Sequence, residues 1–104
     1  MTMPRHKAKR DASEPEIVTA LQGLGCTVYR MDDPVDLLVG FRGVTYLVEA
    51  KTAGTRYGKK LNANQTDFND GWKGSKIIML HSAVDAMDWI VGIASREQRE
   101  ARAA

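Results

Sequence analysis

The chain contains very little cysteine and no long apolar run. Cys26 is the only cysteine among 104 residues, which excludes an intrachain disulfide and any zinc site built from several thiolates. We expect Cys26 to be a small buried residue at the start of a strand. No apolar segment approaches the roughly 20 residues that a transmembrane helix needs, and no apolar stretch of a secretory signal follows the basic N-terminus. We therefore expect a cytoplasmic protein with no membrane partner.

The chain also lacks a large net charge. Its formal net charge is only +2, so no strong overall field attracts a polyanion. Two short segments nevertheless carry cations and no acid, namely residues 1–10 and residues 51–60. Such segments suit a nucleic acid that touches particular surfaces of the protein. A solvated tail and a solvated loop would give the same pattern, and charge alone does not separate the two interpretations.

The first part of the domain is predicted to be an amphipathic helix. Ser13 followed by Glu16 has the spacing of a capping box, and Gly25 is typical of a helix end. The residues that repeat at helical spacing and should form its buried stripe are Ile17, Leu21 and Leu24.

Three strands are expected next. Residues 26–31 alternate and are rich in β-branched side chains, and the apolar runs 36–41 and 44–51 flank the short link Arg42-Gly43. Two such runs joined by a glycine-containing link predict a β-hairpin. Because both runs are apolar on both faces, we expect these strands to be covered on two sides.

The second half of the chain is predicted to contain a loop, a short helix, a strand and a last helix. Residues 52–64 form a long polar loop, a short helix begins near Asn64, and residues 76–82 form a further strand. Ser82 is expected to cap a last helix. Its predicted buried face consists of Val84, Met87, Ile90 and Val91. In the short helix Phe68 and Trp72 are four residues apart, and we interpret Trp72 and Trp89 as packing residues. This order predicts an α/β fold with a mixed sheet and helices on its faces.

The segment "TYLVEAKT" places opposite charges on an apolar strand. In a strand, Glu49 and Lys51 share one face. An antiparallel hairpin turning at Arg42-Gly43 should bring Asp36 to the same edge of the sheet. Two carboxylates without a nearby His or Cys suit Mg²⁺ or Mn²⁺, and a lysine beside them can offset charge at a phosphorus centre.

This pattern leaves alternatives open. Asp32 or Asp33 would satisfy the spacing almost as well as Asp36, although both belong to a predicted turn. A Glu-Lys pair can also serve only as a salt bridge. We favour Asp36 because it begins one of the two apolar strands of the hairpin.

At these residues the sequence resembles a known family. The segment "VDLLVGFRGVTYLVEAKT" is similar to the core motif of the PD-(D/E)XK nuclease superfamily, and in particular to its small stand-alone VRR-NUC members. The similarity extends over "RDASEPEIVTALQGLGCTV" and "LNANQTDFNDGWKGSKIIMLHSAVDAM", which together cover roughly residues 10–92. Val35 departs from the motif, which usually has proline there. The resemblance implies a restriction-endonuclease-like αβββαβ core with a four-stranded mixed sheet.

The resemblance also implies roles for individual residues. Asp36, Glu49 and the carbonyl of Ala50 would bind Mg²⁺, for which Mn²⁺ could substitute. Lys51 would be the catalytic lysine, and Gln65 would match a helix glutamine beside the active site. The implied reaction is metal-dependent hydrolysis of phosphodiester bonds in DNA. Because the sequence also resembles Holliday-junction resolvases, the resemblance implies branched DNA as a substrate.

Members of this family also have a glutamate on the first helix, and two residues compete for that role here. Glu14 lies three residues before Ile17, near the buried stripe, whereas Glu16 falls roughly 100° to one side. We favour Glu14 as the helix carboxylate. An acid that merely complements the helix N-terminus would also explain it.

The expected organisation is a basic arm over residues 1–11, a nuclease domain over residues 12–94 and a charged extension over residues 95–104. A homodimer would be the simplest way for so small a chain to cut both strands of a duplex or a branched DNA. The expected DNA-backbone contacts are Arg10, Arg56, Lys59 and Lys60. The alternative functions are a non-catalytic nucleic-acid-binding module on the same fold and a structural interaction protein.

Overall fold

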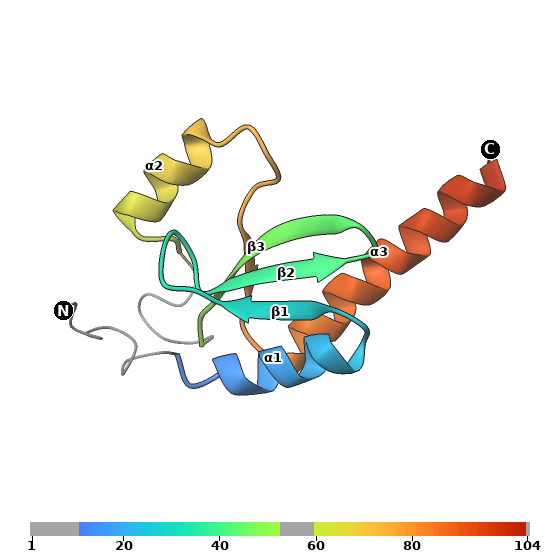
Figure 1. Ribbon diagram of the computed structural model, residues 1–104, viewed down its shortest axis with the longest axis horizontal. Coiled ribbons are helices and arrows are strands. Elements are labelled where there is room, and N and C mark those ends of the chain that lie inside the picture. The colour runs from blue at the N-terminus through green and yellow to red at the C-terminus, as the bar shows by residue number, and fades with distance from the viewer. Residues whose placement is uncertain (1–10, 53–59, 104) are drawn as a thin grey trace.

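The computed structural model describes residues 11–52 and 60–103. Its elements follow the predicted αβββαβα order (Figure 1). In chain order they are α1 (Glu14–Gly23), β1 (Thr27–Arg30), β2 (Leu37–Phe41), β3 (Val44–Ala50), α2 (Ala63–Gly71), β4 (Ile78–Leu80) and α3 (Ala83–Ala103). The predicted α/β fold with a mixed sheet is therefore confirmed.

The sheet has four strands in the order β1-β2-β3-β4. The first three are antiparallel, and β4 pairs with β3 in parallel after the chain has crossed through α2. The hairpin between β2 and β3 turns at Arg42 and Gly43, whose φ angles of 51° and 83° are both left-handed. Two left-handed residues are typical of a type I′ turn, which matches the twist of the flanking strands. The predicted hairpin is thus confirmed.

One face of the sheet carries the hydrophobic core. Helices α1 and α3 contact each other and lie on this face, below the sheet in Figure 1. The buried side chains alternate along the strands, as a face covered by helices requires. They include Leu37, Val39, Phe41, Val48 and Ala50 from the sheet and Ile17, Leu21, Ala86, Ile90 and Ile93 from the helices. Cys26 is buried at the start of β1, as expected, and burial raises the pKa of its thiol.

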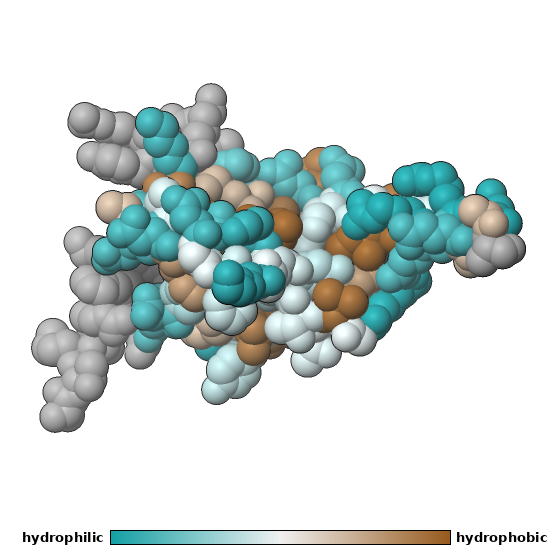
Figure 2. Space-filling model, turned by 90° about the horizontal axis from the view of Figure 1, so that it is seen from above, coloured by the Kyte–Doolittle hydropathy of each residue, from teal (hydrophilic) through white to brown (hydrophobic). Residues whose placement is uncertain are grey.

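The opposite face is only partly covered. Of the described elements, α2 alone stands on this side, at one end of the sheet (Figure 1). Leu38, Gly40 and Leu47 are half-buried there, and Thr45 is exposed. Seen from above, apolar patches lie among hydrophilic side chains (Figure 2). The expectation that both sides of the hairpin would be covered was wrong, because an apolar strand pattern does not show whether a second helical layer exists.

The predicted capping box at Ser13 was also wrong. Ser13 has an α-helical backbone (φ −80°, ψ −12°), and no side-chain cap is formed there by the described residues. Its hydroxyl instead donates to Asp11 Oδ1 at 2.7 Å. A capping box is present in α2, where Asn62 and Gln65 bond each other's backbone N–H.

Two helix faces differ from the prediction. Leu24, expected in the stripe of α1, is partly exposed at the helix end. In α3 the buried side chains are Ala86, Ile90 and Ile93, whereas Val84, Met87 and Val91 face solvent. Where α3 crosses α1, the close approach of the two helices favours a small side chain. Hydropathy alone ranks valine above alanine and therefore predicted the wrong buried face for α3.

The predicted charged extension is the second half of α3. This helix continues without a break to Ala103, and its last turns project beyond the sheet (Figure 1). Arg42 in the hairpin turn donates to Glu97 at 2.7 Å and ties the projecting part to the sheet. Within residues 11–52 and 60–103, no helix is both long enough and apolar enough to cross a bilayer.

Asp11 fastens the start of α1 to the end of β3. Its carboxylate accepts hydrogen bonds from the backbone N–H of Ser13 at 2.9 Å and of Thr52 at 2.8 Å, and from both hydroxyl groups. Burial alone would raise the pKa of Asp11. The hydrogen bonds from Thr52 and Ser13 outweigh burial and lower the pKa from 3.8 to about 2. The ionised form is therefore the one that the fold stabilises.

We expect Asp11→Asn to lower the free energy of unfolding by about 1 kcal/mol at neutral pH, because bonds to a charged acceptor are replaced by weaker ones. A lowered pKa stabilises the fold above pH 3.8, and this contribution is lost as pH falls towards 2. The difference between the two proteins should accordingly shrink on acidification. Urea unfolding over this pH range measures it, with Asp88→Asn on the exposed side of α3 as the control. A pH-independent difference would contradict the assignment.

Candidate active site

The hairpin register brings two carboxylates together. Leu37 pairs with Val48, so Asp36 just before β2 lies beside Glu49 in β3. The backbone N–H of Asp36 donates to Glu49 Oε1 at 3.2 Å, and the N–H of Ala50 donates to Asp36 Oδ2 at 3.1 Å. Glu49 therefore binds the backbone of Asp36, and Asp36 binds the backbone N–H of the residue that follows Glu49. The structure places Asp36, Glu49 and Ala50 at one strand end, as the sequence analysis expected.

Glu49 is a buried acid, with a side chain only 8% exposed. Burial raises its pKa above the ordinary 4.5, and the nearby charge of Asp36 raises it further. A hydrogen bond from Gln65, the ammonium of Lys51 and the N–H of Asp36 act in the opposite direction without cancelling the shift. The fold thus holds a carboxylate where its charge is only partly compensated.

Lys51 continues the same face of the strand. Its Nζ lies 3.6 Å from Glu49 Oε2, and its side chain is largely buried. Its backbone N–H donates to the carbonyl of Leu80 at 3.0 Å, which extends the parallel pairing of β3 with β4. The ammonium is therefore held beside the carboxylate pair by the strand itself.

Gln65 connects α2 to this site. It is buried in the first helical turn, and its Oε1 accepts the backbone N–H of Asn62 at 3.1 Å. Its Nε2 donates to the carbonyl of Pro34 at 3.2 Å, two residues before Asp36. A hydrogen bond from the same side chain also lowers the pKa of Glu49. Gln65 therefore orients Glu49 while it caps its own helix.

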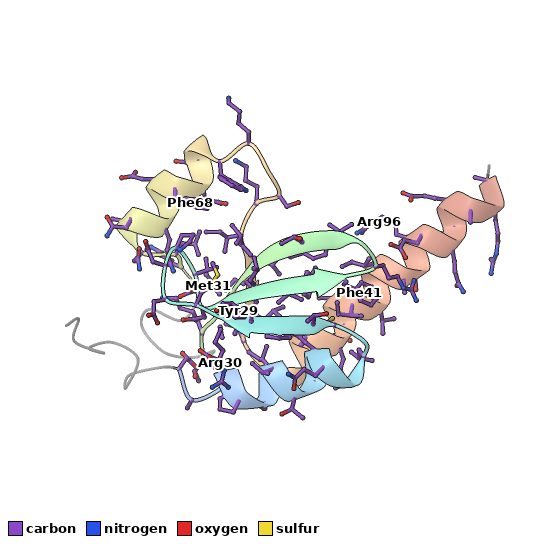
Figure 3. All side chains as sticks on the ribbon, viewed as in Figure 1. Tyr29, Arg30, Met31, Phe41, Phe68 and Arg96 are labelled. Atoms are coloured by element: carbon purple, nitrogen blue, oxygen red, sulfur yellow. The ribbon has the colours of Figure 1, made fainter. Side chains whose placement is uncertain are left out.

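Glu14 occupies a neighbouring position with a partner of its own. It is 1% exposed, whereas Glu16 faces solvent, so the helix phase correctly predicted which acid is buried. Arg30 Nε lies 3.2 Å from Glu14 Oε2. Figure 3 shows Arg30 at the end of β1, next to the start of α1. A direct catalytic role of Glu14 remains a prediction.

Arg30 was not among the site residues predicted from the sequence. It lies opposite Leu37 in the β1–β2 register, and the N–H of the next residue, Met31, donates to the carbonyl of Asp36 at 2.7 Å. A cation at the end of a strand that pairs with the Asp36 strand was the available signal. Of the predicted DNA contacts, Lys60 is exposed just before α2. The others, Arg10, Arg56 and Lys59, lie outside the described residues.

The donor set fits a hard divalent cation. Asp36 and Glu49 supply carboxylate oxygens, and a positive charge between the buried Glu49 and the half-buried Asp36 would offset their repulsion. Among residues 11–52 and 60–103, no group of three or more His, Cys, Asp or Glu side chains is arranged to hold a metal ion. Glu14 is therefore not part of such a group. Two carboxylates completed by a backbone carbonyl, water and a substrate phosphate are a usual arrangement for Mg²⁺.

Comparisons with known proteins gave no match, whether with family models, with curated proteins or with solved structures. The resemblance to PD-(D/E)XK nucleases consequently stays a prediction, and the interpretation of this site depends on its geometry.

We expect Mg²⁺ or Mn²⁺ to stabilise the protein. Binding only to the folded state adds about 2.7 kcal/mol at a hundredfold excess over Kd, enough to raise Tm by several degrees. Asp36→Asn removes one carboxylate and should abolish the rise. Asp88→Asn on α3 is the matched control and should keep it. Thermal unfolding with and without EDTA measures the effect, and an equal rise in Asp36→Asn would exclude the proposed site.

We expect Glu49→Gln to raise Tm in EDTA at neutral pH. The raised pKa of Glu49 means that its protonated form is stabilised by folding, and that this stabilisation is lost as pH rises through the folded-state value. A glutamine mimics the protonated form at every pH, so the difference should shrink below the ordinary value of 4.5. Scanning calorimetry at several pH values tests this. A variant that melts lower than the wild type at neutral pH would contradict it.

Proposed function

We propose that the protein is a metal-dependent endonuclease that hydrolyses phosphodiester bonds in DNA. The observation that carries the proposal is the exchange of hydrogen bonds between the Asp36 and Glu49 segments, with Lys51 Nζ 3.6 Å from Glu49. A buried glutamate held beside a second, half-buried carboxylate is unfavourable for stability alone, even with an ammonium nearby. The arrangement suits a site where a divalent cation neutralises the two carboxylates and where the ammonium faces a substrate phosphate.

Asp36, Glu49 and the carbonyl of Ala50 would hold Mg²⁺ or Mn²⁺. When bound, the ion would polarise the phosphate and lower the pKa of water. Lys51 is placed to orient a water or to offset the negative charge that develops during in-line attack. Gln65 fixes the orientation of Glu49 throughout. None of these groups reads base identity, so the site itself acts on the backbone of the strand.

The proposed substrate is DNA, with branched DNA as the favoured form. Lys60 beside α2 would contact the backbone together with Arg10, Arg56 and Lys59 of the basic segments. A chain with one such site would cut two strands most simply as a homodimer, in which two equivalent sites face one substrate.

We expect the wild type to cleave plasmid or branched DNA with Mg²⁺ or Mn²⁺ and not with EDTA. Asp36→Asn and Lys51→Ala should each reduce the rate at least about 100-fold, because each removes charge stabilisation at the transition state. Asp88→Asn should retain the wild-type rate. Gel assays on folded variants measure this. DNA binding without cleavage under any metal would instead indicate a non-catalytic binding module.

A further inference from the structure

A cavity of about 370 Å³ borders the candidate site at Pro34, whose carbonyl accepts a hydrogen bond from Gln65. Its walls come from the open face of the sheet and from α2, and its lining is mostly apolar. The main lining side chains are Pro34, Leu38, Thr45, Leu47, Phe68 and Trp72. Neither the carboxylate pair nor Lys51 contributes to this lining, so the cavity has a different chemistry from the candidate active site.

The cavity and the candidate site are built on the same strand and the same helix, β3 and α2. Along β3, Leu47 and Glu49 point to the same face, and two strand residues span only about 7 Å. Along α2, Gln65 contacts Glu49, and Phe68 follows three residues later on the same side of the helix. Trp72 lies at the C-cap of α2, where its ring stacks on Phe68. Gln65 and Trp72 are separated by about 10 Å of helical rise. This length matches one or two nucleotides rather than a long segment.

Two aromatic side chains, Phe68 and Trp72, form one wall of the cavity. The rings of Phe68 and Trp72 stack with centroids 5.0 Å apart and planes 23° from parallel. A Cβ at Gly74 would lie 2.5 Å from the indole nitrogen, so only glycine lets the backbone pass this closely. Lys76 Nζ donates to the carbonyls of Asn69 at 2.6 Å and Trp72 at 3.1 Å and fixes the end of α2. Figure 3 shows Phe68 on α2 above the sheet.

Trp72 nevertheless remains 44% exposed. The expectation that Trp72 is simply a packing residue was therefore incomplete. Trp89 does pack, edge-on against Tyr46 with centroids 5.0 Å apart. A large aromatic ring that is held in place but left accessible beside an apolar cavity offers a stacking surface to a flat ligand.

We propose that this cavity binds an unpaired nucleobase of the strand whose phosphate lies in the candidate active site. The inference rests on the proposed function. A base has apolar faces that stack on an aromatic wall, and polar edges that the hydroxyl groups of Thr45 and Ser75 in the lining can bond. A base inside a duplex is already stacked and cannot enter. The proposed substrate is therefore a strand that is single or unpaired at the cleavage position.

Binding is tested in EDTA with Lys51→Ala as the background, so that cleavage is suppressed, and with Trp89→Phe added so that Trp72 is the only tryptophan. A short oligothymidylate should quench its fluorescence, and a fully abasic strand of equal length should not. Trp72→Leu, read by fluorescence anisotropy of labelled DNA, should weaken oligothymidylate binding about tenfold and leave duplex binding unchanged.

Two further variants separate a specific effect from a folding defect. Thr45→Phe fills the cavity from the opposite wall and should reproduce the selective loss. Tyr29→Leu removes a tyrosine that is 69% exposed on the same sheet but outside this cavity, and it should change nothing. Thermal unfolding of each variant confirms that it is folded.

Equal loss of duplex and single-strand binding in Trp72→Leu would overturn the inference, as would equal quenching by the abasic strand. The proposed function fails separately. If the wild type cleaves DNA and Trp72→Leu binds like its parent, only the cavity assignment is wrong. If oligothymidylate quenches Trp72 selectively but no metal supports cleavage by the wild type, the cavity assignment is supported and the proposed nuclease function is wrong.

Discussion

The exchange of hydrogen bonds between Asp36 and Glu49 is the interaction on which the site depends. The Glu49 carboxylate accepts the backbone N–H of Asp36, and the Asp36 carboxylate accepts the backbone N–H of Ala50. The two bonds join the start of β2 to the end of β3. Because strand side chains alternate, a register slip of one residue would turn Glu49 towards the core and disrupt both bonds. The left-handed turn at Arg42 and Gly43 sets this register from the other end of the hairpin.

This arrangement joins stability to the proposed chemistry. Burial of Glu49 beside Asp36 opposes ionisation and thus weakens the metal-free fold. Gln65 and Lys51 offset part of this penalty. The same Gln65 caps α2, so the helix and the carboxylate are positioned by one side chain. The small domain can therefore contain these charges because Gln65 and Lys51 partly compensate them while they also belong to the structural framework.

The uneven covering of the sheet gives the molecule two different faces. Helices α1 and α3 pack against one face, where their buried side chains form the core together with those of the strands. On the other face, α2 is the single helix that the described residues supply, and the space beside it is the cavity lined by Leu47, Phe68 and Trp72. A second full helical layer would have buried Leu47 and closed this space. The proposed binding of an unpaired base is thus a consequence of an incomplete layer.

Local sequence determined the element order, the hairpin and the proximity of Asp36 to Glu49, because alternation and turn chemistry operate over a few residues. Only tertiary contacts decided the remaining features. Asp11 displaced the expected Ser13 cap through a contact with Thr52, 41 residues away. The contact with α1 set which face of α3 is buried, and the absence of a second helix layer over the described sheet left Trp72 accessible. Such features depend on which surfaces meet in space, and residue spacing carries no record of that.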